Sequence, residues 1–302
     1  MKRSNTIDCC KGFAIILVVF GHLLQRQNPI TPDHNLLFRI IYSFHMGLFF
    51  FLAGQVFKKR PLSKEIILNF KRLIVPFFCF FFIVTCSLNI DVFIGRFCEY
   101  ILNPQIGFWF LFVLATIRLI ASFILQNKLI STFFFLITLF FLEFFLKKLF
   151  ALDYILFYIP IFLIGFFSVN YSSHLTNKIK KIALMSDIEG WIFLFFLLIA
   201  YIYFFKFYSR NLEGVSMIFF LTQKYILAIL GISISLKFFQ MFDFENLYRF
   251  FSYIGKYTLC IYGLHFLFAD FYLYVGYLAI MPMLFFPIFT QDVYSYLMTR
   301  FK

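Results

Sequence analysis

The segment that decides the fold is Thr6–Gln27, TIDCCKGFAIILVVFGHLLQRQ. From Gly12 to Leu24 its only strongly polar side chain is His22, and the run with its flanks approaches the roughly 20 residues that cross a bilayer core. A cleaved signal peptide is the alternative, because a short basic start precedes the apolar run, but no small-x-small cleavage pattern follows. The sequence therefore predicts a membrane-spanning helix over about 8–26.

Two ionisable side chains, Lys11 and His22, lie on this predicted helix. They are eleven residues apart, about three helical turns, so they share one face with roughly 16 Å between them. An ionisable group within a membrane is expensive and usually serves a function. Asp8 lies three residues before Lys11 and is expected to pair with it across one turn.

The composition indicates a polytopic membrane protein. Of 302 residues, 63% are hydrophobic and only 14% are charged, with a mean hydropathy of +0.90, far outside the range of soluble domains. The net charge of +13 does not indicate nucleic-acid binding, because the Lys and Arg residues fall in short loops between apolar runs and set topology there. Six cysteines without CxxC spacing argue against a metal knot or a disulfide framework.

An all-α fold of about ten transmembrane helices is predicted from the apolar runs. Their approximate ranges are 8–26, 37–57, 67–88, 107–126, 129–147, 152–170, 190–206, 214–237, 250–270 and 275–296. With both termini cytoplasmic, the inner segments hold about twice as many Lys and Arg residues as the outer ones, as the positive-inside rule requires. Loops are short except for about 89–106 and 171–189, so residues 1–302 are expected to form a single transmembrane domain. Pro282 and Pro287 are expected to kink the last span.

Three histidines, His22, His45 and His265, are expected at similar depths in the outer half of the membrane, on three different helices. A satisfied core histidine is the ordinary explanation for any one of them, but their location within the membrane favours a functional role. A three-histidine zinc site would use the same set, yet no HxH, HxxxH or HExxH spacing supports it, so no metal is expected. His34 and His174 are expected to be solvated.

A second polar cluster opens the third predicted span, NFKRLIVPFF at 69–78. Lys71 and Arg72 lie at its cytoplasmic edge, and Pro76 is expected to bend or loosen the helix. Anchoring at the membrane edge is one explanation for the two cations. The other is an anion clamp, in which Arg72 holds phosphate through its planar fork and Lys11 joins from the first helix.

Several separated stretches resemble the acyltransferase-3 family of membrane O-acyltransferases, particularly its branch related to fucose 4-O-acetylases and polysaccharide O-acetyl or O-succinyl transferases. They are IDCCKGFAIILVVFGH (7–22), SFHMGLFFFLAG (43–54), KRLIVPFF (71–78), FWFLFVLATI (108–117) and IGKYTLCIYGLHFLF (254–268). The sequence departs from the family pattern at Lys11, Gly47, Ala53 and Asn69, where relatives commonly have Arg, Pro, Ser and Arg.

The resemblance implies an enzyme of a bacterial cytoplasmic (inner) membrane that uses acyl-CoA, commonly acetyl-CoA, as a cytoplasmic co-substrate. The implied acceptor is a hydroxyl of a sugar, polysaccharide or lipid-linked glycan, and no cofactor is bound permanently. The resemblance assigns catalysis to His22 and donor handling to Lys11 and Arg72. Trp109 and Tyr262 lie in two of the matching stretches and are expected, with Asp8, to support the site.

The expected mechanism uses His22 as a general base that activates the acceptor hydroxyl. His45 and His265 would orient this base, polarise the thioester or bind the acceptor, and the sequence does not separate these roles. Two alternatives remain open. One is a proton-coupled transporter or flippase of a lipid-linked glycan, with the histidines as a proton relay. The other is a structural or sensor membrane protein.

Overall fold

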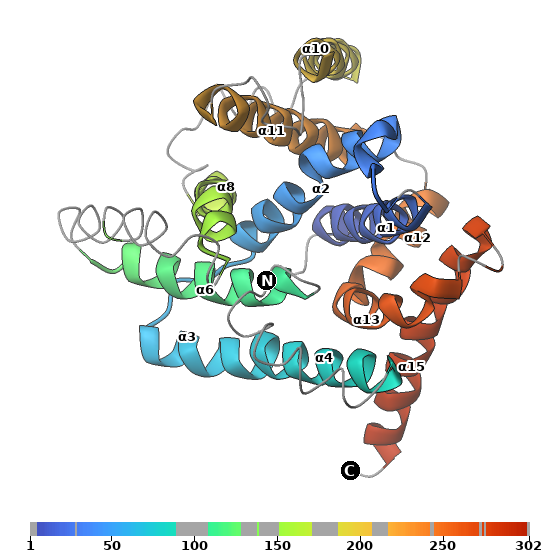
Figure 1. Ribbon diagram of the computed structural model, residues 1–302. Helices are drawn as coiled ribbons and strands as arrows, with labels where there is room; N and C mark the ends of the chain where they lie inside the picture. Colours follow the sequence, from blue (N-terminus) through green and yellow to red (C-terminus); the bar gives the residue numbers. More distant parts are fainter. Residues whose placement is uncertain are drawn as a thin grey trace. The chain divides into compact units, whose positions relative to one another are not determined.

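The computed structural model describes residues 5–27, 29–88, 108–127, 138, 151–170, 187–206, 217–241, 245–271, 274 and 276–300. Every regular element in these ranges is helical (Figure 1). The all-α prediction is therefore confirmed for the described part of the chain. The predicted span over 129–147 and the loops over 89–106 and 171–186 lie outside it, apart from residue 138.

The long helices are α1 (Asn5–Gln27), α2 (Leu36–Gln55), α4 (Val75–Leu88), α6 (Trp109–Ile124), α8 (Leu152–Asn170), α10 (Asp187–Lys206), α11 (Met217–Met241), α12 (Glu245–Lys256) and α15 (Ile280–Arg300). Two shorter α-helices are α3 (Leu62–Asn69) and α13 (Thr258–Leu264). The 3-10 turns are η1 (Pro32–His34), η4 (His265–Phe271) and η5 (Gly276–Ala279), and η2 (Phe70–Ile74) is a π turn.

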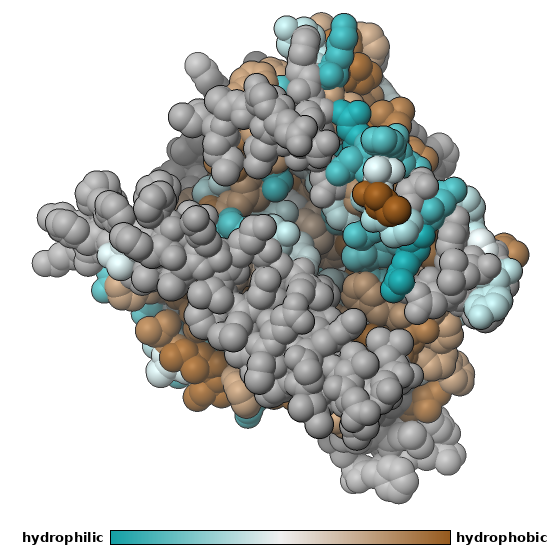
Figure 2. Space-filling model, in the orientation of Figure 1, coloured by the Kyte–Doolittle hydropathy of each residue, from teal (hydrophilic) through white to brown (hydrophobic). Residues whose placement is uncertain are grey.

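Six helical segments in the described ranges are long and apolar enough to cross a membrane. They are Thr6–Gln27, Leu36–Gln55, Leu62–Val84, Leu152–Asn170, Phe219–Met241 and Gly276–Val293. Trp109–Ile124, Gly190–Lys206 and Thr258–Phe268 are apolar but shorter. Ten spans and cytoplasmic termini therefore stay predictions. Figure 2 shows hydrophobic side chains at the surface over α3, where Ile67 is 56% exposed, as lipid contact allows.

The chain divides into two compact units. The first comprises residues 1–52 and 170–302, and the second comprises residues 53–169. Each unit is described by itself below. The prediction of one transmembrane domain over the whole chain stays a prediction.

In the first unit, α1 and α12 cross with their backbones in contact. A Cβ atom on Gly12 would overlap the carbonyl oxygen of Phe251, and one on Gly255 would overlap the carbonyl oxygen of Asp8. Small residues allow this close approach between helices in a membrane. Beside the crossing, the rings of Phe13, Phe239 and Phe251 pack edge to face. The crossing thus holds α12 and the chain that follows it against α1.

Helix α2 packs against the C-terminal part of α1 and against α10. Leu24, Phe38 and Ile41 form one buried cluster between α1 and α2. On the other side of α2, the buried hydroxyl groups of Ser43 and Tyr201 are hydrogen-bonded at 2.6 Å. These contacts fix the position of α2 within the first unit.

The structure differs from the predicted ninth span, which was expected to be one helix over 250–270. The chain instead forms α12, α13 and η4 in succession. Tyr257 separates the two α-helices with φ −104° and ψ 10°, and its N–H donates to Ile254. The segment is therefore discontinuous, and α12, α13 and η4 each contact α1. In the last predicted span, Pro287 does not end the helix, because α15 continues through it.

Candidate functional site

The structure brings His22 of α1 and His265 of η4 together. Their ring centroids lie 5.2 Å apart, with 31° between the ring planes. Phe266 contacts both rings, at 5.0 Å from His22 and 4.0 Å from His265. His22 is half-buried, whereas His265 is fully buried. Tyr262, 6% exposed, has its ring centroid 6.2 Å from that of His265.

The protonation pattern of His265 follows from its backbone contact. Its Nδ1 lies 2.9 Å from the carbonyl oxygen of Ile261, one turn earlier. A carbonyl oxygen can only accept a hydrogen bond, so Nδ1 carries the hydrogen and Nε2 of the neutral ring carries a lone pair. Nε2 is buried and has no hydrogen-bond partner among the described residues. The ring therefore presents an unused acceptor beside His22.

His45 on α2 has the same backbone contact in a different setting. Its Nδ1 donates to the carbonyl oxygen of Ile41 at 2.6 Å, and the side chain is 3% exposed. Its ring packs against Tyr42, whose hydroxyl donates to Gln25 Oε1 at 3.3 Å. Among the described residues no group of three His, Cys, Asp or Glu side chains is arranged to hold a metal ion. His22, His45 and His265 are not such a group in the part of the chain that the structure describes.

Asp8 and Lys11 lie at the other end of α1, next to the crossing with α12. Asp8 is 3% exposed and its backbone touches Gly255, while Lys11 is half-buried. Lys11 and His22 are thus displayed by one uninterrupted helix. Lys11, which is expected to bind the donor, and His22, which is expected to act as the base, therefore lie on the same helix.

Lys71 and Arg72 lie in the π turn η2 of the second unit, and both are exposed. The N–H of Val75 reaches back to the carbonyl oxygen of Phe70, five residues earlier. Pro76 has no N–H for the Arg72 carbonyl and crowds it sterically, so the wider turn relieves the helix at this point. The predicted loosening at Pro76 thus takes the form of a π turn that carries both cations.

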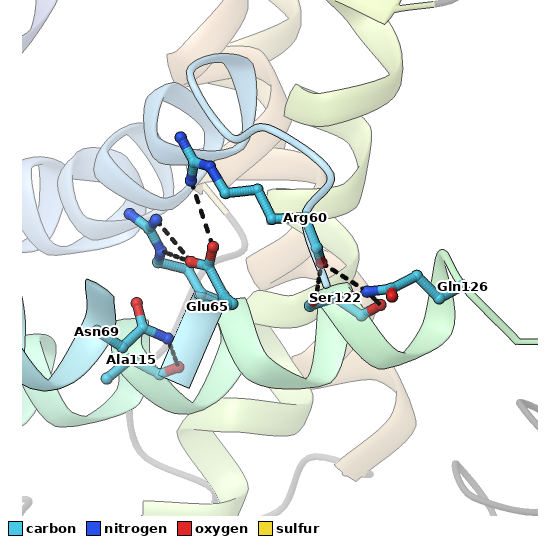
Figure 3. A network of polar contacts seen from close by, with 7 residues as sticks. Arg60, Glu65, Asn69, Ala115, Ser122 and Gln126 are labelled. Carbon is cyan, nitrogen blue, oxygen red and sulfur yellow. Dashed lines mark hydrogen bonds and ion pairs between the residues drawn. The ribbon is translucent and has the colours of Figure 1, made fainter. Parts of the chain in front are cut away.

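A buried ion network fixes the helix that precedes this turn (Figure 3). Glu65 of α3 is fully buried and accepts from Arg118 of α6, with Nε at 2.8 Å and Nη2 at 2.7 Å from Oε1. Arg60 Nη1 lies 3.3 Å from the other carboxylate oxygen. One turn later, Asn69 donates to the carbonyl oxygen of Ala115 at 3.1 Å. Two successive turns of α3 are therefore attached to α6.

Trp109 begins α6 in the same unit. Its indole stacks on Tyr158 at 5.8 Å and contacts Tyr154 at 4.5 Å, both on α8. The tryptophan thus joins α6 to α8. Lys71, Arg72 and Trp109 all belong to the second unit, and their placement relative to the histidine pair stays a prediction.

A family model described as an acyltransferase domain matches residues 4–290, nearly the whole chain. The chain belongs to the acyltransferase-3 family. The Nodulation protein NolL of Sinorhizobium fredii is 45% identical over 58 residues, which are 18% of this chain and 16% of that protein. No solved structure matches the chain.

Two features of this acyltransferase-3 protein were not predicted from the sequence. Gln25, one turn after His22 on α1, accepts a hydrogen bond from the hydroxyl of Tyr42, and its spacing of three residues from His22 was the available signal. The ion network of Glu65 with Arg60 and Arg118 had no such signal. Arg60 lies in the loop before α3, Glu65 in α3 and Arg118 in α6, and only folding brings Arg118 to the other two.

Proposed function

We propose that this protein transfers an acyl group, in the simplest case acetyl, from acyl-CoA to a hydroxyl of a sugar, polysaccharide or lipid-linked glycan, with His22 as general base. The observation that carries the proposal is the half-buried imidazole of His22 beside the buried imidazole of His265. A neutral imidazole suits proton transfer near neutral pH. Membership of the acyltransferase-3 family supports the reaction class.

In this reaction a ring nitrogen of His22 takes the proton from the acceptor hydroxyl while the oxygen of that hydroxyl attacks the thioester carbonyl. The tetrahedral intermediate collapses with cleavage of the carbon–sulfur bond, and the thiolate of coenzyme A takes the proton from the imidazolium. The base is neutral again after each turnover, so no further reactant is needed. General base catalysis of this kind contributes about 10²–10⁴ in rate.

The basic residues Lys11, Lys71 and Arg72 are proposed to bind the phosphates of the acyl-CoA donor. Exposed cations on a π turn suit a polyanion that arrives from solvent, and Arg72 provides two parallel donors to phosphate oxygens. The proposed partners are acyl-CoA, a glycan acceptor and the bilayer of a bacterial inner membrane. Asp8, Trp109 and Tyr262 are proposed to support the site through the packing described above.

Acyl transfer from radiolabelled acetyl-CoA to surface glycan, measured in purified membranes, tests the proposal. We expect His22→Ala to lower the rate by about 10²–10⁴-fold. His34→Ala provides the matched control, because His34 is an exposed histidine in η1 and should leave the rate unchanged. Undiminished activity in His22→Ala, with normal activity in the control, would refute the assignment of the base.

Translocation of a lipid-linked glycan is a second candidate, and one observation favours it. The membrane segment over 250–270 is interrupted at Tyr257, and discontinuous helices are typical of transporter binding sites. This function needs no acyl-CoA and leaves the glycan unmodified. Glycan movement across vesicles in the absence of acyl-CoA would therefore favour transport over transfer.

A further inference from the structure

The Nε2 atom of His265 needs an explanation, because a buried acceptor without a partner is unfavourable. The atom is inaccessible to solvent and lacks a hydrogen bond among the described residues. Leaving such a group unsatisfied forfeits the hydrogen bond that it would make to water in the unfolded chain. Native proteins retain these groups mainly where a ligand, a water molecule or a catalytic step uses them.

The nearest titratable neighbour is the ring of His22. An in-plane N–H···N hydrogen bond of about 3 Å places two imidazole centroids about 5 Å apart, and the observed separation is 5.2 Å. In the structure this bond is not formed, because Nε2 of His265 has no partner among the described residues; a reorientation of the half-buried His22 ring would form it. Phe266 contacts both rings.

We propose that His265 is a positioning residue for His22, whose N–H donates to the Nε2 atom of His265 during acyl transfer. This inference rests on the proposed function. The Ile261 carbonyl fixes the hydrogen on Nδ1 of His265, Nε2 then accepts from His22, and the other nitrogen of His22 faces the hydroxyl. A base oriented by a third group is the general arrangement for activating a hydroxyl nucleophile.

His265 stays neutral throughout this sequence. The proton that leaves the acceptor hydroxyl remains on His22 and passes to the departing thiolate of coenzyme A. His265 only accepts a hydrogen bond, which fixes the ring orientation of His22 and stabilises its imidazolium. A neutral acceptor is suited to this position, because a carboxylate buried in the membrane would carry a large desolvation cost.

Two substitutions of His265 separate hydrogen bonding from packing. His265→Leu removes the acceptor and retains an apolar side chain, while His265→Gln retains an oxygen that can accept from His22. We expect His265→Leu to lower kcat by about 10–100-fold, by analogy with the loss of groups that orient metal-binding imidazoles, with KM for acyl-CoA unchanged. His265→Gln should recover most of the lost kcat.

A double-mutant cycle with His22→Ala decides whether His265 acts through His22. If it does, adding His265→Leu to His22→Ala lowers the residual rate no further. A further fall in the double variant overturns the proposal, because His265 would then act on the substrate or on the fold directly. Equal loss of kcat in folded His265→Leu and His265→Gln overturns it as well.

Thermal unfolding in detergent shows which variants are folded. If His265→Leu does not fold, kcat of His265→Gln is compared with that of the wild type, and the same substitution is tested in the His22→Ala background. An effect on kcat only where His22 is present supports the proposal. Absence of acyl transfer by the wild-type protein is a separate outcome. It would overturn the proposed function itself, whereas the results above concern His265 alone.

Discussion

Replacing Glu65 with glutamine should destabilise the second unit strongly while hardly changing the shape of the side chain. The substitution removes the negative charge that Arg118 contacts at 2.7 and 2.8 Å and that Arg60 contacts at 3.3 Å. The Glu65 side chain is fully buried, and the Arg118 side chain is 18% exposed. Without the carboxylate, Arg118 remains in a mostly dry site without its counter-ion.

The expected loss is about 3–5 kcal/mol, the cost of removing one partner from a buried ion pair. Most of it arises from Arg118, because its two short bonds are charge-assisted and shielded from solvent. The Arg60 side chain is 30% exposed, so its share is about 1 kcal/mol or less. Removing the stranded cation in Glu65→Gln/Arg118→Gln should recover part of the loss.

Chemical unfolding in detergent micelles, followed by tryptophan fluorescence, measures this effect. Trp109 lies on α6, the helix that carries Arg118, and a Trp191→Phe background makes it the only tryptophan of the chain. Glu245→Gln is the matched control, because Glu245 forms an exposed ion pair with Arg249 and should lose at most about 1 kcal/mol.

A loss in Glu65→Gln no larger than in Glu245→Gln would refute the reasoning. The carboxylate would then be solvated or unpaired, and α3 would not depend on it. With the expected loss confirmed, the same variant should also raise KM for acyl-CoA under the proposed function, since α3 leads directly into the π turn that carries Lys71 and Arg72.

Three further substitutions test the packing around the site. Gly255→Ala places a methyl group against the backbone of α1 and should separate the histidine pair, lowering kcat by about 10²-fold, whereas Gly190→Ala meets only flexible side-chain ends at 3.1–3.2 Å and should keep wild-type activity. Ser43→Ala removes the 2.6 Å hydrogen bond to the buried Tyr201 hydroxyl, which keeps a longer bond of 3.4 Å to the carbonyl oxygen of Ile40, and should cost about 0.5–1.5 kcal/mol in detergent unfolding; no change would mean that the bond to Ser43 contributes nothing to stability. Pro76→Ala restores a regular α-helical hydrogen bond, should reorient both cations of the π turn and raise KM for acyl-CoA, and an unchanged KM would exclude the turn from donor binding.

Local features of the structure could be predicted from the sequence. The helices over α1, α2 and α8 follow from uninterrupted apolar runs, because hydrophobicity and length decide membrane insertion segment by segment. The irregularity at Pro76 follows from a missing N–H, which is likewise a property of a few neighbouring residues. Functional roles for His22 and His265 could be predicted because ionisable groups are rare and energetically costly in apolar segments.

Tertiary structure decided which of these groups meet. The sequence placed three histidines at one depth, but only packing put His22 against His265 and set His45 beside Tyr42. The pairing depends on the crossing at Gly12 and Gly255 and on the break at Tyr257, since both determine how η4 returns to α1. Apolar periodicity specifies that a helix is buried, whereas its neighbour is chosen by shape and hydrogen bonding between segments far apart in the chain.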